Sequence, residues 1–446
     1  MEIQQQKQRQ MEIQLVTFMA RFPPTPPPDE FGTSFLGSIE EYMEAHTGIY
    51  IFEYVEKYIN EIGPQHVVQV VTDNATNNMT AAELLKVKQP HVFWTSCATH
   101  TINLMLEAIG KLSKFSGVLE KTKALTIFIY AHHRTLAIMR KYTKKRDIVR
   151  PGVTRFATSF LTLESLKGKK DQLRLMFTSD EWSKTKLRTT LKGKAAEATV
   201  TSISFWNGVS LALNVFTPLV KVLRLVDGDK KPSMAFLFGA LEQAKEEVKK
   251  NFKKEENAIP ILKIVDTKSK GRLDSPLHYT TYLLNPFFYF KDSSIHNDAN
   301  VMNEFLNCVD KVFSTDTNMQ SIISNVELLN YKNKSGNFSR KMAIAAYEKV
   351  DVYHDFDPVG WWSNYGGDTP NLQRMAMRFL SLTSSSSGCE RNWSQFEGLV
   401  EGGDEDQVEP GSGLTWKMVA EASGADEVLR PRRVKGESLL ENLTRI

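Results

Sequence analysis

The chain has 446 residues, 41 % of them hydrophobic, and can therefore bury a large core organised in two or three domains. Its formal net charge of +4 is too small to indicate a nucleic-acid partner by itself. Three cysteines, none in a CxxC pair, argue against a disulfide framework and against a zinc ribbon built from these residues alone. The N-terminus lacks the apolar stretch of a secretory signal, so we expect a soluble intracellular protein.

A Gln-rich leader that ends in a proline linker, PPTPPP, precedes the first predicted element. From there, strands and helices alternate, which predicts a parallel or mixed sheet with helices on its faces. The predicted elements are a strand at 31–39, a helix at 48–62, a valine-rich strand ending at Asp73, a helix at 76–87, a strand at 91–96 and a helix at 99–114.

Long helical patterns dominate the chain after Arg155 and predict an all-helical region up to about residue 350. The apolar run 203–223 is the one candidate for a membrane span, but it contains two asparagines, Lys221 and Pro218. We therefore expect a core helix that breaks at Pro218, and no membrane partner. Residues 398–446 combine glycine and acidic residues with a basic end, a composition typical of disorder.

Asp73 is the first candidate for chemistry, because α/β folds place functional groups at the carboxyl ends of buried strands. The alternative is that its carboxylate caps the following helix. A second candidate is the stretch 134–155, with eight Lys or Arg against one Asp. It could bind phosphates or form a solvated helix face, and both interpretations stay open.

Six segments in this order resemble a plant hAT-superfamily transposase derivative, a protein with a domain of unknown function over an RNase H-like core. They are VVTDNATNN, WTSCATHTINLMLEAIGKL, RPGVTRFATSFLTLESL, SPLHYTTYLLNPFFYF, DPVGWWSNYG with TPNLQRMAMRFLS, and SSSSGCERNWSQFE. The resemblance implies an α/β plus all-α fold, in which a truncated RNase H-like mixed sheet is interrupted by a large helical insertion domain. It divides the chain into a leader (1–30), a truncated RNase H-like domain (31–156), the helical insertion domain (157–357), a partial hAT C-terminal dimerisation region (358–397) and a largely disordered tail (398–446).

In the family that the chain resembles, two Asp and one Glu hold two divalent metals that act on a phosphodiester. By resemblance, Asp73 matches the second Asp and Glu390 matches the terminal Glu, so Asp73 would bind Mg²⁺ or Mn²⁺ if a metal site survives. Cys97 and His100 match a CxxH motif near the carboxylates. The alternative for this pair is a helix N-terminus with a packed thiol and a hydrogen-bonded imidazole.

The resemblance also shows departures from the family. The segment that would carry the first catalytic Asp has no counterpart, nor does the N-terminal zinc finger, and the C-terminal dimerisation region is interrupted after Phe396. We therefore expect no enzyme activity and no cofactor, because the loss of one metal ligand removes most two-metal activity.

The leading hypothesis is a catalytically inactive, transposase-derived nuclear protein that dimerises with hAT-like proteins, binds DNA and takes no small-molecule substrate. An active metal-dependent transposase or nuclease, and a transposon relic without function, are the alternatives. The predicted nucleic-acid contacts are Lys144, Lys145, Arg146, Arg150 and Arg155. The predicted dimerisation residues are Trp361, Trp362, Cys389, Arg391 and Trp393, although buried core is an alternative for the tryptophans.

Overall fold

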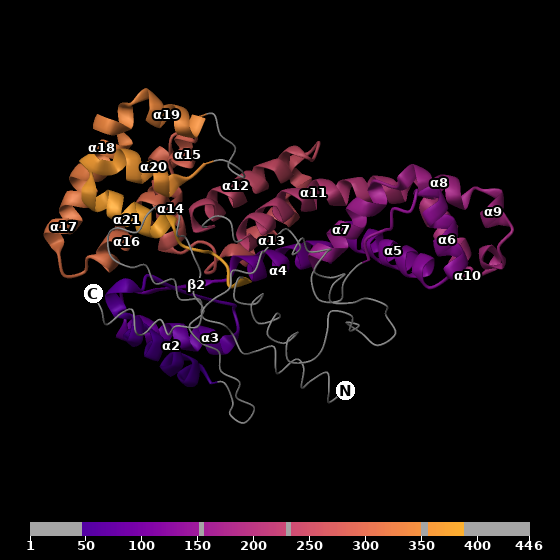
Figure 1. Ribbon diagram of the computed structural model, residues 1–446, viewed down its shortest axis with the longest axis horizontal. Helices are drawn as coiled ribbons and strands as arrows, with labels where there is room; N and C mark the ends of the chain where they lie inside the picture. The colour runs from indigo at the N-terminus through magenta and orange to yellow at the C-terminus, as the bar shows by residue number, and fades with distance from the viewer. Residues whose placement is uncertain (1–46, 151–155, 229–232, 349–355, 388–446) are drawn as a thin grey trace, which may run out of the picture. The chain divides into compact units, whose positions relative to one another are not determined.

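A computed structural model describes residues 47–150, 156–228, 233–348 and 356–387. The chain divides into two compact units, Met1–Asn392 and Trp393–Ile446, and the second lies outside the described residues. The strand predicted at 31–39 also lies outside them. The description below therefore concerns the first unit (Figure 1).

The first unit is mostly helical and contains a small parallel sheet. Its strands are β1 (Gln69–Thr72) and β2 (Phe93–Ser96). Its α-helices are α2 (Gly48–Ile62), α3 (Thr76–Lys88), α4 (Ala98–Gly110), α5 (Ser113–Tyr130), α6 (His133–Tyr142), α7 (Phe156–Lys167), α8 (Lys170–Phe177), α9 (Asp180–Ser183), α10 (Leu191–Thr201), α11 (Ile203–Asp227), α12 (Met234–Lys250), α13 (Ile259–Ser269), α14 (Pro276–Leu284), α15 (Pro286–Tyr289), α16 (Ala299–Val312), α17 (Thr317–Ile322), α18 (Leu328–Lys332), α19 (Lys341–Glu348), α20 (Pro358–Tyr365) and α21 (Pro370–Leu380).

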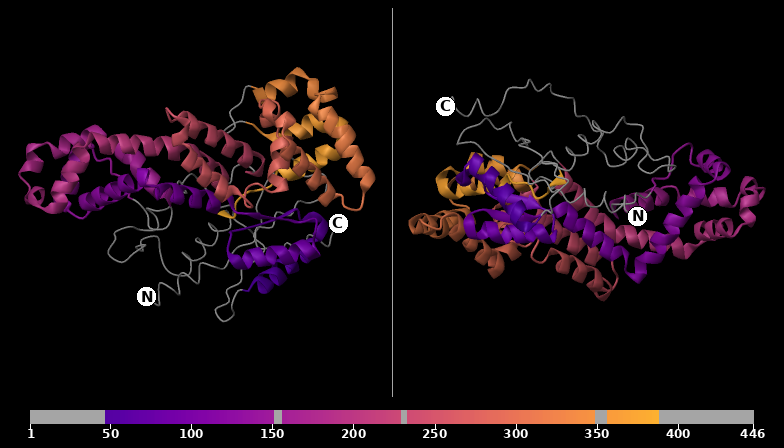
Figure 2. Two further views of the ribbon diagram at one scale, coloured as in Figure 1. Left: turned by 180° about the vertical axis from the view of Figure 1, so that it is seen from behind. Right: turned by 90° about the horizontal axis from the view of Figure 1, so that it is seen from below.

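The two strands lie between helices. In the parallel pair, Gln69 is opposite Phe93 and Thr72 is opposite Ser96. One core joins Val70 of β1 to side chains of α2 and α3, and these helices lie alongside the strands in Figures 1 and 2. Phe93 contacts Phe379 of α21, with ring centroids 6.0 Å apart. Helices on both sides explain why all four residues of β1 are buried, instead of every second one.

The elements predicted around the sheet are confirmed. The helix predicted at 48–62 is α2, with the same bounds, and the strands predicted to end at Asp73 and at residue 96 correspond to β1 and β2. The helix predicted at 99–114 is shorter, because α4 ends at Gly110 and a new helix begins at Ser113.

Two large apolar cores hold the helices together. The first joins α4, α5 and α6 to α7 through α13, so the predicted boundary at residues 156 and 157 runs through a single core. The second joins the start of α12 to α14 through α21 and includes Val68 and Phe93 next to the sheet. The predicted boundary at residues 357 and 358 lies within this second core.

Helix α11 corrects one prediction, because it continues through Pro218 instead of breaking there. Proline has no N–H, so the carbonyl of Asn214, one turn earlier, loses its helical donor. The side-chain amide of Asn251 donates to that carbonyl at 2.8 Å and replaces the missing hydrogen bond. By length and composition α11 could cross a membrane, and in this fold it contributes Val209, Phe216 and other buried side chains to the first core.

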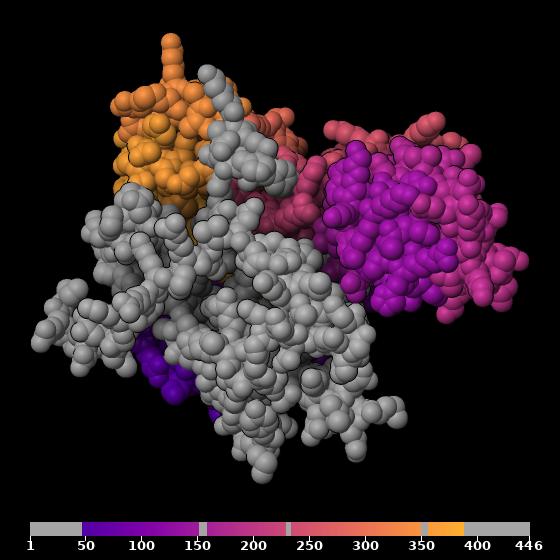
Figure 3. Space-filling model, turned by 45° about the vertical axis from the view of Figure 1, so that its right-hand side comes forward, coloured from indigo at the N-terminus to yellow at the C-terminus, as the bar shows by residue number. Residues whose placement is uncertain are grey.

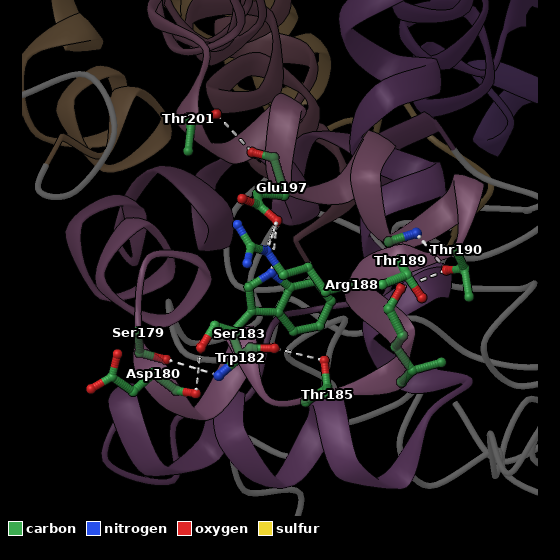
Figure 4. A network of polar contacts seen from close by, with 12 residues as sticks. Ser179, Asp180, Trp182, Ser183, Thr185, Arg188, Thr189, Thr190, Glu197 and Thr201 are labelled. Atoms are coloured by element: carbon green, nitrogen blue, oxygen red, sulfur yellow. Dashed lines mark hydrogen bonds and ion pairs between the residues drawn. The ribbon is translucent and has the colours of Figure 1, made fainter.

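A polar network joins α9 to α10 around the buried Trp182 (Figure 4). The indole Nε1 donates to Glu197 Oε2 at 2.9 Å, and Arg188 Nε donates to the same oxygen at 3.3 Å. Thr190 accepts from the N–H of Gly193 and so caps α10. These contacts provide hydrogen-bond partners for the N–H groups at helix ends and for a buried indole N–H. The network therefore has a structural role.

Candidate functional site

The carboxyl edge of the sheet brings together two of the predicted site segments. Asp73 follows β1 directly and Cys97 follows β2 directly. The N–H of Cys97 donates to the carbonyl of Thr72 at 2.6 Å, which extends the strand pairing by one residue. Asp73 and the CxxH segment are therefore neighbours at this edge, as expected for parallel strands.

The carboxylate of Asp73 is held by the first turn of α3. Its Oδ1 accepts from the N–H of Ala75 at 2.8 Å and from the side-chain amide of Asn78 at 3.0 Å. This contact two residues along the chain is an Asx turn that leads into the helix. The capping alternative thus describes the role of Oδ1, whereas no described residue donates to Oδ2.

Two amide oxygens beside Asp73 are buried and have no hydrogen-bond partner among the described residues. The side chain of Asn78 is fully buried, and its Oδ1 accepts no hydrogen bond within the described structure. Asn74 donates to Thr101 at 3.3 Å, and its Oδ1 is likewise buried without a donor there. Unsatisfied acceptors of this kind are uncommon in folded proteins and suit a water molecule or a cation.

The described residues at the edge do not by themselves complete a two-metal centre, and Glu390, the second predicted carboxylate, lies outside them. Within the part of the chain that the structure describes, no group of three or more His, Cys, Asp or Glu could hold a metal ion. A two-metal site needs several carboxylates at bridging distance. Asp73 alone, even with its neighbouring amide oxygens, does not meet that requirement.

The CxxH pair is divided between interior and surface. Cys97 is fully buried, and its Sγ accepts from the N–H of Ser386 at 3.4 Å. His100 is exposed on the first turn of α4. The structure therefore shows the helix N-terminus and the packed thiol of the alternative interpretation, with the imidazole of His100 exposed.

A buried serine segment, 384–387, closes over the start of α4 and was missed in the sequence. The carbonyl of Ser384 accepts from the N–H of Ala98 at 2.8 Å, and Ser385 Oγ lies 2.8 Å from Thr99 Oγ1. Ser384 also exchanges hydrogen bonds with Ser233, just before α12. The run SSSS is the signal that could have indicated it, because four small hydroxyls suit a tight polar junction.

The basic stretch ends α6 in a turn with unusual backbone angles. Lys144 and Lys145 have φ values of 54° and 61°, in the left-handed region. The N–H of Lys145 donates to Arg140 O at 2.7 Å and that of Lys144 to Lys141 O at 3.4 Å, which is the Schellman pattern of helix ends. Glycine usually occupies this left-handed position. A lysine there places a positive charge at the turn, but its backbone conformation is strained.

Charges around this turn are unevenly paired. Arg140 forms a bidentate pair with Asp147, and its hydrogen bond holds the pKa of that carboxyl below its usual range. Lys144, Lys145 and Arg146 are exposed and form no ion pair with any described residue. These three side chains, called the basic turn below, present uncompensated positive charge. Helices α5 to α8, coloured purple to magenta, form this part of the surface in Figure 3.

A shallow cavity of about 310 Å³ opens next to the basic turn. Arg146, Ser165 and Lys169 line it together with Glu164. Burial lowers the pKa of Lys169, and the nearby charge of Arg146 lowers it further. Two cations that repel each other across a cavity favour a bound anion, because an anion relieves the repulsion. Arg150 stands nearby, with its guanidinium 4.3 Å from the ring centroid of Tyr130.

The predicted dimerisation tryptophans are core residues. Trp361 Nε1 donates to Ala343 O at 2.9 Å, and Trp362 Nε1 donates to Leu284 O at 2.7 Å. The ring of Trp361 stacks on Phe338 with centroids 5.4 Å apart. Both indoles are buried, so their direct contacts are within the chain. The other predicted site residues, Arg155, Cys389, Glu390, Arg391 and Trp393, lie outside the described residues.

A buried glutamate near the C-terminal helices was also missed. Between α17 and α18 the helix widens into a π-helical turn, η5 (Ile323–Glu327). Glu327 is 4 % exposed and accepts from the N–H groups of Asn371 and Leu372 at 3.3 and 2.5 Å. It also accepts from the side-chain amide of Asn371 at 2.9 Å. Glu327 thus caps α21 from another helix, a role that no local sequence signal predicts.

Two family models match the chain. A domain of unknown function, DUF659, matches residues 4–125, which include part of the leader, both strands and Asp73. The hAT family C-terminal dimerisation region matches residues 327–401, which begin at Glu327 and include the tryptophans and the serine segment. No curated protein matches the chain. The two matches show that these two parts of the chain are similar to a DUF659 domain and to the hAT family C-terminal dimerisation region, and support a relation to hAT-family transposases.

Proposed function

We propose that this protein is a non-catalytic, transposase-derived dimer that binds nucleic acid through the basic turn. The observation that carries the proposal is the turn itself: adjacent lysines in left-handed conformations and an arginine, exposed and without ion pairs to the described residues. Strained non-glycine residues persist where the surrounding structure or a function maintains them. Phosphate oxygens are the ligands that such a group of cations binds.

The dimer part of the proposal is supported by the match to the hAT dimerisation region. Its partners would be a second copy or another hAT-like protein. A truncated RNase H-like core is supported by Asp73 at the end of one of two parallel strands. The proposed absence of catalysis rests on the sequence, in which the segment that would carry the first catalytic Asp has no counterpart. A protein that binds DNA would work in the nucleus, which is the location we propose.

Binding of a labelled DNA duplex over a range of salt concentrations tests the nucleic-acid part. We expect the variant K144A/K145A/R146A to bind more weakly and to lose about 3 from the slope of log affinity against log salt, since each phosphate contact contributes about 0.9. The control is K250A/K253A/K254A, which removes the same charge from exposed lysines at the end of α12. Equal losses in both variants would mean that only net charge matters and would overturn the basic turn as the site.

A second measurement addresses the absence of catalysis. DNA binding should be unchanged by EDTA, and the protein should not cut a supercoiled plasmid in Mg²⁺ or Mn²⁺. Cleavage that disappears in Asp73→Asn would instead establish the metal-dependent nuclease. That alternative has one observation in its favour, since Oδ2 of Asp73 and two nearby amide oxygens are unpartnered within the described structure.

A further inference from the structure

The helix that runs from α17 through η5 to α18 is apolar on two opposite sides. Its inner side carries Ile323, Leu328 and Tyr331, which belong to the second core. Its outer side carries Val326 and Leu329, each 54 % exposed. A surface helix normally has one apolar face, and a helix with two is covered on both.

The outer side chains have the spacing of a helix-packing seam. Ile322, which is half-buried, precedes Val326 by four residues, and Leu329 follows three residues later. This 4–3 spacing keeps the three side chains on one line along the helix. They are called the outer stripe below. Helix α17 lies at the outer edge of the C-terminal helices coloured orange in Figure 1.

The helix that carries the outer stripe has few charged residues. Its flanking side chains are neutral, among them Ser321, Asn325 and Asn330. Glu327, the acidic residue of the segment, turns inward to cap α21. Lys332, its cation, lies 3.8 Å from Met302 of α16. A neutral face does not repel a second copy of itself, and depletion of charge is typical of interface centres.

We propose that the outer stripe is the contact by which two copies of this chain pair. A second copy is the occupant we propose, because Leu329 lies within residues 327–401, which match the hAT dimerisation region, Val326 directly precedes them, and the stripe's own helix carries little charge that would repel a like surface. In a two-fold dimer the same patch meets itself, so the helices would pack antiparallel, with each stripe against its counterpart. This inference rests on the proposed dimer and names its surface.

The pattern distinguishes the outer stripe from other exposed apolar residues. Val87 on α3 and Leu191 on α10 are more exposed, at 84 % and 88 %, but belong to helices whose exposed apolar residues form no such line. Single exposed apolar side chains are normal on soluble proteins. These two positions therefore provide matched controls.

The test measures the oligomeric state of the full chain by sedimentation equilibrium over a range of concentrations. We expect the wild type to be a dimer and V326E/L329E to dissociate at least tenfold more readily, with an unchanged circular dichroism spectrum. The control V87E/L191E should dimerise like the wild type. In addition, mixing Val326→Glu with Val326→Lys should restore a heterodimer, because Val326 lies at the middle of the stripe and its two copies meet near the two-fold axis.

The outcomes separate this surface from the proposed function. A wild-type dimer that persists in V326E/L329E would overturn the outer stripe and leave dimerisation intact. A monomeric wild type would overturn both. A monomer whose α17–α18 helix is protected from hydrogen exchange would mean that another part of the chain covers the stripe. If the charged variants do not fold, oxidation of Val326→Cys, at the centre of the stripe, should still link two copies, and failure to link would count against the proposal.

Discussion

Two carboxylates at the beginnings of helices show how differently the sheet edge and the C-terminal helices use polar groups. Asp73 is half-buried, and its two donors among the described residues, the N–H of Ala75 and the side-chain amide of Asn78, both bind the same oxygen. Glu327 is buried, and each of its oxygens accepts from the start of α21. Both oxygens of Glu327 are therefore used in hydrogen bonds within the fold, whereas Oδ2 of Asp73 accepts no hydrogen bond from the described residues and could bind a ligand.

The two carboxylates also differ in how easily they can be recognised from the sequence. Asp73 attracts attention because it follows a buried strand, a position that folds use for chemistry. Glu327 sits in an ordinary helical pattern, NVELLN, and gains its importance from a helix more than forty residues later. Satisfied polar groups stabilise, and partly satisfied ones at an open edge are available for ligands.

Replacement of the two carboxylates provides the strongest test of this comparison. Glu327→Ala should lower the free energy of unfolding by about 3–5 kcal/mol, because it leaves buried donors at the start of α21 unsatisfied. Asp73→Ala should cost about 1 kcal/mol, the usual effect of losing a helix-capping contact. Denaturation with guanidinium chloride, followed by circular dichroism, measures both. Similar losses of unfolding free energy in the two variants would contradict the conclusion that Glu327 contributes more to stability than Asp73.

The features that could be predicted from the sequence are those set by neighbouring residues, and the features that were missed depend on partners far away in the chain. Local periodicity and turn chemistry predicted α2, both strands and the position of Asp73, because these depend on neighbours in the sequence. The continuity of α11 was missed, since it depends on Asn251 replacing the hydrogen bond that Pro218 cannot donate. The burial of Ser384 likewise depends on Ser233, far away in the sequence. Such tertiary partners leave no periodic signal.

Acid should destabilise the C-terminal helices through His278. This residue is buried in α14, with Nδ1 2.7 Å from Ser275 Oγ, and burial lowers its pKa to about 4. The unfolded chain binds the proton near pH 6.5, so the contribution is complete above that pH and is lost as the pH falls toward 4. We expect a loss of about 3 kcal/mol over this window.

Unfolding measured at pH 7 and pH 4.5 tests this expectation. His278→Gln should be less stable at pH 7 but should show a smaller fall on acidification. His100→Gln is the matched control, because His100 is exposed at the sheet edge and its loss should leave the difference unchanged. An equal fall in wild type and His278→Gln would assign the acid sensitivity to other groups.

The smallest expected effect is an increase in stability, whereas most substitutions decrease it. Lys144→Gly should raise the free energy of unfolding by about 0.5–1 kcal/mol, because glycine adopts the left-handed angle of this helix end without strain. Lys123→Gly, in an exposed position within α5, should lower it by about 1 kcal/mol. Thermal melts distinguish the two. Both variants lose one positive charge, yet only Lys144→Gly should weaken DNA binding and reduce its salt slope by about 1.

A gain in stability together with a loss of binding would mean that the basic turn keeps lysine against the preference of its own backbone. If Lys144→Gly were more stable and bound DNA normally, the strained backbone at Lys144 would not be explained by DNA binding. The lysines would then serve only to complement the negative end of the α6 dipole, to which any cation near the last turn contributes.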